Sequence, residues 1–176
     1  ANAAIIEASK AFSKELMKKY HIPTAKYETF TEMGKALAYI DEQGAPIVVK
    51  AGGLALGKGV VVASTVDEAK TAVREMMEDH KFGQSGSTVV IEECMVGPEV
   101  TVLAFCDGEH LVPMLSSQDH KRAYDGNLGP NTGGMGAFCP SPKYTPEIAK
   151  ECMEKIFLPT VAALKAEGRP FKGVIY

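Results

Sequence analysis

The sequence has no Trp, no long apolar run and no excess of positive charge. A membrane-spanning helix needs roughly 18 or more consecutive apolar residues, so we expect no membrane partner. Lys and Arg number 19 and Asp and Glu number 22, which gives a formal net charge of −3. These charges are interleaved, whereas binding to a phosphate backbone requires a basic surface, so we expect no nucleic-acid partner.

Cysteines are few and widely spaced, at positions 94, 106, 139 and 152. They form no CxxC pair and have no histidine at zinc-ligand spacing, which favours a reduced, cytoplasmic protein without a structural zinc site. The first residues carry no signal-peptide pattern and no initiator Met. They enter a helical pattern at once, and the last residues lie in a strand pattern, so we expect a fold that is incomplete at both ends.

Apolar spacing predicts an α+β protein with room for two small lobes. A first helix is expected before Pro23, a second over residues 31–40 closed by Gly44, and a third capped by Thr65 and Glu68. Pro159 should kink or divide a last helix over 144–167. The expected strands cover 46–50, 59–63, 88–92, 100–105, 110–114 and 172–176, with a tight turn at 107–108.

Residues 50–59, between two apolar strands, form a glycine cluster that contains Lys50 and Lys58. Glycines allow tight turns and bring backbone N–H groups close to phosphate oxygens. The spacing resembles a P-loop, but Gly59 replaces the Ser or Thr hydroxyl and a strand follows instead of a helix. We therefore predict a hairpin that closes over a nucleotide, with Lys50 directed at the phosphates. The alternative is a surface hairpin without a ligand.

Residues 89–99 read as a buried strand that ends in two carboxylates and an apolar stretch. Extended backbone can pair with an adenine edge, and Glu99 can accept hydrogen bonds from both ribose hydroxyls. On this segment alone, a solvated strand edge is an equal alternative.

From 116 to 142 the sequence shows no sustained periodicity, which indicates a long binding loop. Residues 117–122 and 129–137 concentrate donors, acceptors and glycines, a composition suited to gripping a phosphate or a sugar. Arg122 is the stronger candidate for stabilising charge during phosphoryl transfer. His120 alone is more simply an ordinary loop histidine.

These three motifs, in this order, resemble the glycinamide ribonucleotide synthetase branch of the ATP-grasp superfamily. The similarity covers almost the whole chain, and its most specific parts are residues 118–122 and 129–137. The resemblance implies two α+β lobes with a nucleotide between them. It divides the chain into an entry helix (1–22), a small lobe with the glycine-rich lid (23–93) and part of a larger lobe with the substrate loop (94–176).

The resemblance also implies roles for individual residues, with Lys50 and Arg122 as the catalytic pair. Glu92, Glu93, Cys94 and Met95 would line the adenine pocket. The full set implied to contact ATP is Lys10, Lys50, Gly53, Gly57, Lys58, Gly59, Glu92, Glu93, Cys94, Met95, Glu99, Arg122 and Asn131. The set implied to face 5-phosphoribosylamine is Asp119, Gly133, Gly134, Met135 and Gly136.

The implied reaction activates glycine with ATP as glycyl phosphate, and the amine of 5-phosphoribosylamine then attacks to give glycinamide ribonucleotide, ADP and phosphate. Mg²⁺ would neutralise the phosphates. Its family ligands lie beyond the position of Tyr176, so we predict no metal ligand on this chain. Gly52 and Pro98 depart from the family pattern, which leaves lid mobility and the ribose contact open. Two alternatives remain, a truncated or engineered nucleotide-binding module without turnover and an ATP-grasp ligase with another acceptor.

Overall fold

The computed structural model describes residues 2–55, 59–79, 81–126 and 128–176, without the side chains of residues 130 and 131. The chain forms two compact units, Ala1–Val96 and Gly97–Tyr176. This division falls after Val96, whereas the sequence placed the boundary after Glu93. Helices and antiparallel sheets occur in both units, which confirms the α+β prediction. Among the described helices, none is both long enough and apolar enough to cross a membrane.

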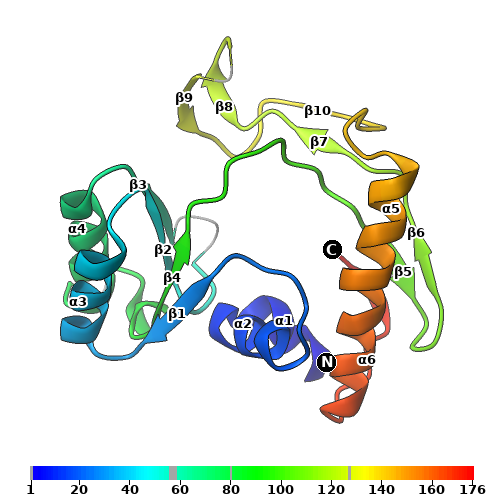
Figure 1. Cartoon of the computed structure of the whole chain (residues 1–176), viewed down its shortest axis with the longest axis horizontal. Coiled ribbons are helices and arrows are strands. Elements are labelled where there is room, and N and C mark those ends of the chain that lie inside the picture. Colours follow the sequence, from blue (N-terminus) through cyan, green and yellow to red (C-terminus); the bar gives the residue numbers. More distant parts are fainter. Residues whose placement is uncertain (1, 56–58, 80, 127) are drawn as a thin grey trace. The chain divides into compact units, whose positions relative to one another are not determined.

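The first unit is built on a four-stranded antiparallel sheet with two helices against one face (Figure 1). The helices contribute small and apolar residues, and the strands contribute every second side chain to the same core. In spatial order the strands are β1 (Tyr27–Phe30), β4 (Val89–Glu93), β2 (Ile47–Ala51) and β3 (Val60–Ala63). The helices are α3 (Met33–Gln43) and α4 (Val66–Met77), and the 3-10 turn η2 covers Gly83–Gly86.

Local signals fix the ends of α3 and α4 as the sequence predicted. Gly44 follows α3 with φ of 76°, a conformation that glycine adopts without a steric cost. At the start of α4, the Thr65 hydroxyl accepts from the Glu68 N–H while the Glu68 carboxylate accepts from the Thr65 N–H. This capping box satisfies donors that the first helical turn leaves unpaired.

The helix predicted before Pro23 is interrupted, so the prediction of one continuous helix was wrong. It consists of η1 (Asn2–Ala4), α1 (Ile5–Ala8) and α2 (Lys10–Lys19). Ser9 separates the last two because its backbone is extended and pairs with Gly53, while its hydroxyl caps α2 by accepting from the Phe12 N–H. A contact with a residue distant in sequence thus overrides the helical spacing.

The second unit contains a three-stranded antiparallel sheet whose inner face packs on the last helical segment. Its core joins Ala104, Cys106 and Ile175 of the sheet to Phe157 and Val161 of the helices. The strands in spatial order are β11 (Gly173–Ile175), β5 (Ala104–Cys106) and β6 (Leu111–Pro113). The predicted division of the last helix is confirmed, since α5 (Pro146–Cys152), the π-helical turn η3 (Met153–Phe157) and α6 (Leu158–Ala166) follow one another, with Pro159 in the first turn of α6.

Residues 116–142 contain two small antiparallel pairs, which corrects the prediction of a loop without regular structure. One pair joins β7 (Gln118–Asp119) to β10 (Ala137–Phe138), and the other joins β8 (Arg122–Tyr124) to β9 (Leu128–Asn131). Strands of two to four residues are too short to show a period in the sequence. The same reason explains why β1 was missed.

Candidate functional site

Lys50 and Glu92 lie on the face of the first sheet that is opposite to α3 and α4. Lys50 of β2 is paired with Val90 of β4, and Glu92 is two residues further along β4, so both side chains project from the same face. The Lys50 ammonium group donates a hydrogen bond of 2.7 Å to Glu92 Oε2. The sheet register thereby brings together two predicted site residues that are far apart in sequence.

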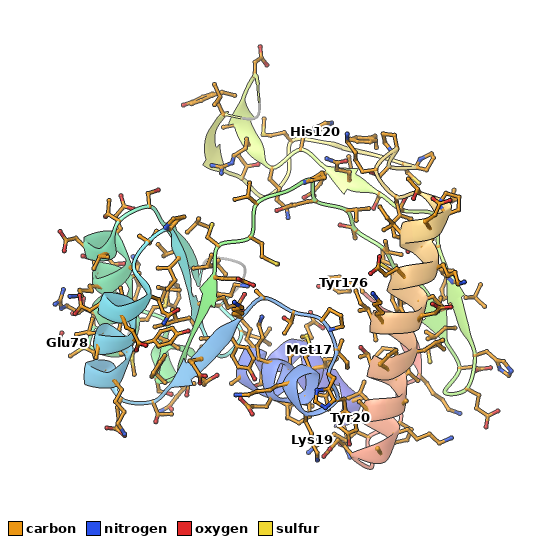
Figure 2. The ribbon with its side chains drawn as sticks, in the orientation of Figure 1. Met17, Lys19, Tyr20, Glu78, His120 and Tyr176 are labelled. Carbon is orange, nitrogen blue, oxygen red and sulfur yellow. The ribbon has the colours of Figure 1, made fainter. Side chains whose placement is uncertain are left out.

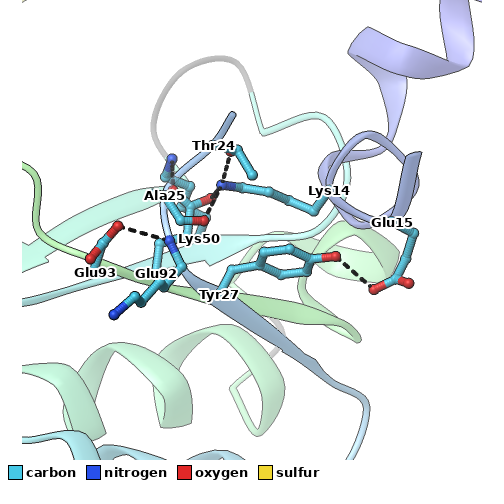
Figure 3. Close-up of polar contacts among 9 residues, drawn as sticks. Lys14, Glu15, Thr24, Ala25, Tyr27, Lys50, Glu92 and Glu93 are labelled. Atoms are coloured by element: carbon cyan, nitrogen blue, oxygen red, sulfur yellow. Dashed lines mark hydrogen bonds and ion pairs between the residues drawn. The ribbon is translucent and has the colours of Figure 1, made fainter. Parts of the chain in front are cut away.

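A third charged residue, Lys14 of α2, completes this group (Figure 3). Its ammonium nitrogen lies 3.3 Å from Glu92 Oε1 and donates to Thr24 Oγ1 at 2.7 Å and to the Ala25 carbonyl at 3.3 Å. The Lys14 and Glu92 side chains are only 9% and 6% exposed, whereas Lys50 is 26% exposed. Lys14 was not among the predicted site residues, although its position four residues after Lys10 places both lysines on one helical face.

Lys10 anchors the start of α2 to the glycine segment. Its backbone N–H donates to the Gly52 carbonyl at 2.8 Å, and its ammonium group donates to the Gly53 carbonyl at 2.9 Å. Burial, together with the nearby Lys50 cation, lowers the pKa of Lys10, and Glu92 partly opposes that shift. Burial also lowers the pKa of Lys14, again against the attraction of Glu92.

The ammonium groups of Lys14 and Lys50 therefore contact one buried carboxylate, and the Lys10 ammonium group lies close enough to be affected by its charge. Lys50 lowers the pKa of both other lysines, which shows that the cations repel one another at this site. A further anion relieves such repulsion, and a triphosphate carries several negative charges. The residues present thus fit the phosphate groups of a nucleotide.

The glycines beside this cluster are packed closely against the rest of the first unit. A Cβ atom at Gly52 would lie 3.0 Å from the Thr88 carbonyl oxygen, and one at Gly53 would lie 2.7 Å from Ser85 Oγ. The N–H groups of Gly52 and Gly53 donate to the carbonyls of Thr88 and Ser85. These two N–H groups are therefore committed within the protein, so contact between Gly53 and ATP remains a prediction.

At the other end of the glycine cluster of residues 50–59, a Cβ atom at Gly59 would lie 2.5 Å from Ala55 Cβ. The Gly59 carbonyl accepts a hydrogen bond from the Ala51 N–H, which closes the base of the predicted hairpin. Gly57 and Lys58 lie outside the described residues. The antiparallel pairing of β2 with β3 agrees with a hairpin across this segment.

The residues predicted to line an adenine pocket differ in their surroundings. Glu92 is buried between lysines, which excludes the solvated strand edge for that residue. Glu93 is exposed, and its Oε1 accepts from the Lys26 N–H at 2.9 Å. Cys94 is half-buried and Met95 is largely exposed, just beyond the end of β4. Adenine binding by these residues stays a prediction.

In the second unit, the β7–β10 pairing brings Asp119 next to the glycine turn predicted to face 5-phosphoribosylamine. Asp119 is opposite Ala137, which directly follows Gly136. Beyond this pair, the His120 N–H donates to the Gly136 carbonyl at 2.8 Å and the Met135 N–H donates to the His120 carbonyl at 2.7 Å. The His120 side chain is labelled in Figure 2. Its ring packs on Phe138 with centroids 5.4 Å apart.

Arg122 and Glu99 are both exposed in the second unit. The Arg122 guanidinium donates to the Gly129 carbonyl at 2.7 Å, and its backbone is in register with Asn131 across β8 and β9. Glu99 accepts from the Lys121 ammonium group at 2.7 Å, and this hydrogen bond raises the pKa of Lys121. Over the parts of the chain that the structure covers, no three His, Cys, Asp or Glu side chains are grouped to hold a metal ion.

Comparison with known proteins adds evidence on the family of this chain. Residues 8–176 match the family model described as phosphoribosylglycinamide synthetase, ATP-grasp (A) domain. A phosphoribosylamine–glycine ligase of Streptococcus pyogenes serotype M1 is 55% identical over 174 residues, which cover 99% of this chain and 41% of that protein. The corresponding enzyme of Vibrio vulnificus strain YJ016 is 52% identical with the same coverage. The chain thus spans about two fifths of the length of these relatives.

A solved structure supports the same assignment. The crystal structure of phosphoribosylamine–glycine ligase from Thermotoga maritima matches with a TM-score of 0.85 and 31% sequence identity, over 98% of this chain and 44% of that one. The predicted ATP-grasp fold and the resemblance drawn from the three motifs are both confirmed. The chain therefore belongs to the phosphoribosylglycinamide synthetase ATP-grasp (A) domain family.

Proposed function

We propose that this chain supplies the ATP site and part of the acceptor site of an enzyme that joins glycine to 5-phosphoribosylamine. In that reaction ATP converts glycine to glycyl phosphate, and attack by the amine gives glycinamide ribonucleotide, ADP and phosphate. Family membership and the names of the longer relatives support the proposal. The four cysteines, which form no disulfide, agree with a cytoplasmic location.

The observation that carries the proposal is the surplus of positive charge around Glu92. Lys50 is partly exposed and directs its ammonium group along the sheet face, so it is suited to hold a phosphate. Lys10 adds a second cation beside the glycine segment. Mg²⁺, when bound with the nucleotide, neutralises phosphate charge and orients the transferring group. Arg122 would stabilise charge that develops during transfer, since its guanidinium remains exposed.

The glycine turn of the second unit is suited to a ligand with a phosphate or a sugar. At Gly133, Gly134 and Gly136, no described atom outside the adjacent residues lies within 4 Å of the position that a Cβ would occupy. The backbone is therefore open to a ligand on this side, while the Gly134 N–H donates to Thr132 Oγ1 and the Gly136 carbonyl accepts from the His120 N–H. Asp119, held next to this turn, offers an acceptor for ribose hydroxyls or for the amine.

A second candidate function is nucleotide binding without turnover. The chain spans only 41% of the length of its relatives, while the lysine cluster is formed entirely by residues of the first unit. Binding of ATP and completion of the reaction are therefore separable properties. Multiple turnover by this chain alone would exclude the second candidate.

Calorimetric titration of the chain with Mg-ATP tests the nucleotide site. We expect saturable binding, weakened about tenfold or more by Lys50→Ala, because hydrogen bonds to charged groups contribute about 1.5–3 kcal/mol. Lys35→Ala is the matched control, since Lys35 is exposed and pairs with Glu32 on α3. Absence of binding by a folded chain would overturn the proposal. A separate experiment, product analysis with glycine and alternative amines, tests the identity of the acceptor.

A further inference from the structure

We propose that Lys14 is a positioning residue that neutralises Glu92, so that the Lys50 ammonium group is able to leave this carboxylate and bind a nucleotide phosphate. The proposal rests on the assignment of Lys50 to the phosphates under Proposed function. It gives Glu92 a role as a shared counterion, distinct from the adenine contact implied for it by resemblance. The three residues are called the Lys14–Glu92–Lys50 network below.

The hydrogen bonds of Lys14 show why this residue is unsuited to bind a ligand directly. An ammonium group has three donors, and Lys14 faces three acceptors in Thr24 Oγ1, the Ala25 carbonyl and Glu92 Oε1. Its side chain is 9% exposed. Lys14 is therefore saturated and enclosed, and its charge acts through Glu92.

Lys50 has the opposite properties within the same network. It is the more exposed of the two lysines and is bound to the other carboxylate oxygen, Glu92 Oε2. Movement of Lys50 toward a phosphate would leave a carboxylate that is only 6% exposed with fewer counterions. An uncompensated buried charge is strongly unfavourable, so Lys50 is released easily only if a second cation stays with Glu92. Lys14 is in place to do so.

Lys10 provides an internal comparison. Its ammonium group is held by the Gly53 carbonyl, a neutral acceptor, at 2.9 Å. Departure of Lys10 toward a phosphate leaves no buried charge behind. Lys14 should therefore affect nucleotide binding through Lys50 and not through Lys10.

Titration of five variants with Mg-ATP, one of them a control, tests this coupling. Lys14→Met should weaken ATP binding about tenfold, and addition of Glu92→Gln should restore affinity to within about threefold of wild type. In a Lys50→Ala background, Lys14→Met should have almost no further effect. Lys18→Met, the same change at an exposed lysine of α2, is the matched control and should bind like wild type. Additive losses in all backgrounds would show a merely structural role and would overturn the proposal.

Acylation of the Lys50 amine, followed by mass spectrometry without nucleotide, gives an independent readout. With Lys14 removed, Glu92 retains Lys50 more firmly, so labelling of Lys50 should slow about threefold in Lys14→Met and rise above the wild-type rate in Lys14→Met/Glu92→Gln. Loss of structure would instead accelerate labelling. An unchanged rate in folded Lys14→Met would overturn the proposal. If Lys50 is labelled at the expected rates but the chain fails to bind ATP, the network is supported and the proposed function is overturned.

The test remains decisive if Lys14→Met does not fold. The double variant Lys14→Met/Glu92→Gln removes both members of the buried pair, a change that is much less damaging than removal of one. Because Lys50 then lacks its carboxylate partner, its amine should be labelled faster than in wild type. Equal rates in these two folded proteins would contradict the Lys14–Glu92–Lys50 network.

Discussion

Two glycine-rich segments of this protein, one in each unit, use glycine for different physical reasons. In the segment around Gly53, a Cβ atom would collide with neighbouring residues. At Gly134, no described atom outside the adjacent residues lies within 4 Å of the Cβ position, but φ is +119°, a conformation that other residues rarely adopt. Close packing therefore requires glycine at Gly53, whereas unusual backbone geometry favours it at Gly134.

The charged residues of the two units differ in a parallel way. Glu92 of the first unit is buried between two lysines, whereas Glu99 of the second unit pairs with Lys121 in an exposed position. Buried ion pairs are costly to break, and exposed pairs contribute little. The stability of the first unit should thus depend on its charged site residues. The second unit should tolerate replacement of its own charged residues.

The largest effect on stability is expected at Glu92, and Glu99 is its comparison in the second unit. Glu92→Gln should lower the free energy of unfolding by about 3–5 kcal/mol, because it leaves Lys14 buried without its counterion. Glu99→Gln should lower it by less than about 1 kcal/mol. Urea denaturation of both variants measures the difference. Similar losses for the two would remove the contrast between buried and exposed pairs.

A smaller loss is expected for Gly53→Ala. The new Cβ would lie 2.7 Å from Ser85 Oγ and 3.0 Å from Ser85 Cβ, and overpacking of this kind costs about 1–3 kcal/mol. Thermal unfolding should show a corresponding fall in Tm. Ser85→Gly removes both atoms, so the double variant Gly53→Ala/Ser85→Gly should be less damaged than the sum of the single changes predicts. Strict additivity would argue against close packing as the reason for this glycine.

Gly134→Ala should cost about 1 kcal/mol through backbone strain, since space for the methyl group is available. Gly133→Ala is its matched control, because Gly133 has the same free space without a positive φ. This control should stay within about 0.5 kcal/mol of wild type. Equal melting temperatures for the two variants would show that conformation is not limiting in this turn.

The smallest effect is the pH dependence of the Glu99–Lys121 pair. The hydrogen bond from Lys121 to Glu99 raises the pKa of Lys121 above its ordinary value of 10.5. A raised pKa of a base means that the stabilisation is fully present below pH 10.5 and disappears as the pH rises through the folded-state pKa. The stability difference between wild type and Lys121→Met should therefore vanish at higher pH. A difference that persists there would point to packing by the aliphatic stem.

Much of the fold was accessible from local patterns. The capping box at Thr65, the end of α3 at Gly44 and the division of the last helix near Pro159 all depend on residues close in sequence. The break at Ser9 was not predicted because it depends on pairing with the distant Gly53. The strands within residues 116–142 were not predicted because two to four residues are too few to show a period. Lys14 was missed because a lysine on a helix surface is ordinary until its buried partner is known.

The sequence by itself determined the α+β class, the order of the main elements and the motifs that indicate the ATP-grasp family, because these follow from local periodicity, capping and residue composition. Only the tertiary structure decided which charges meet. The register of β2 on β4 sets Lys50 beside Glu92, and the docking of α2 adds Lys14 to them. Burial makes the loss of one partner costly, since a charge removed from water is weakly screened and its former partner stays behind unpaired.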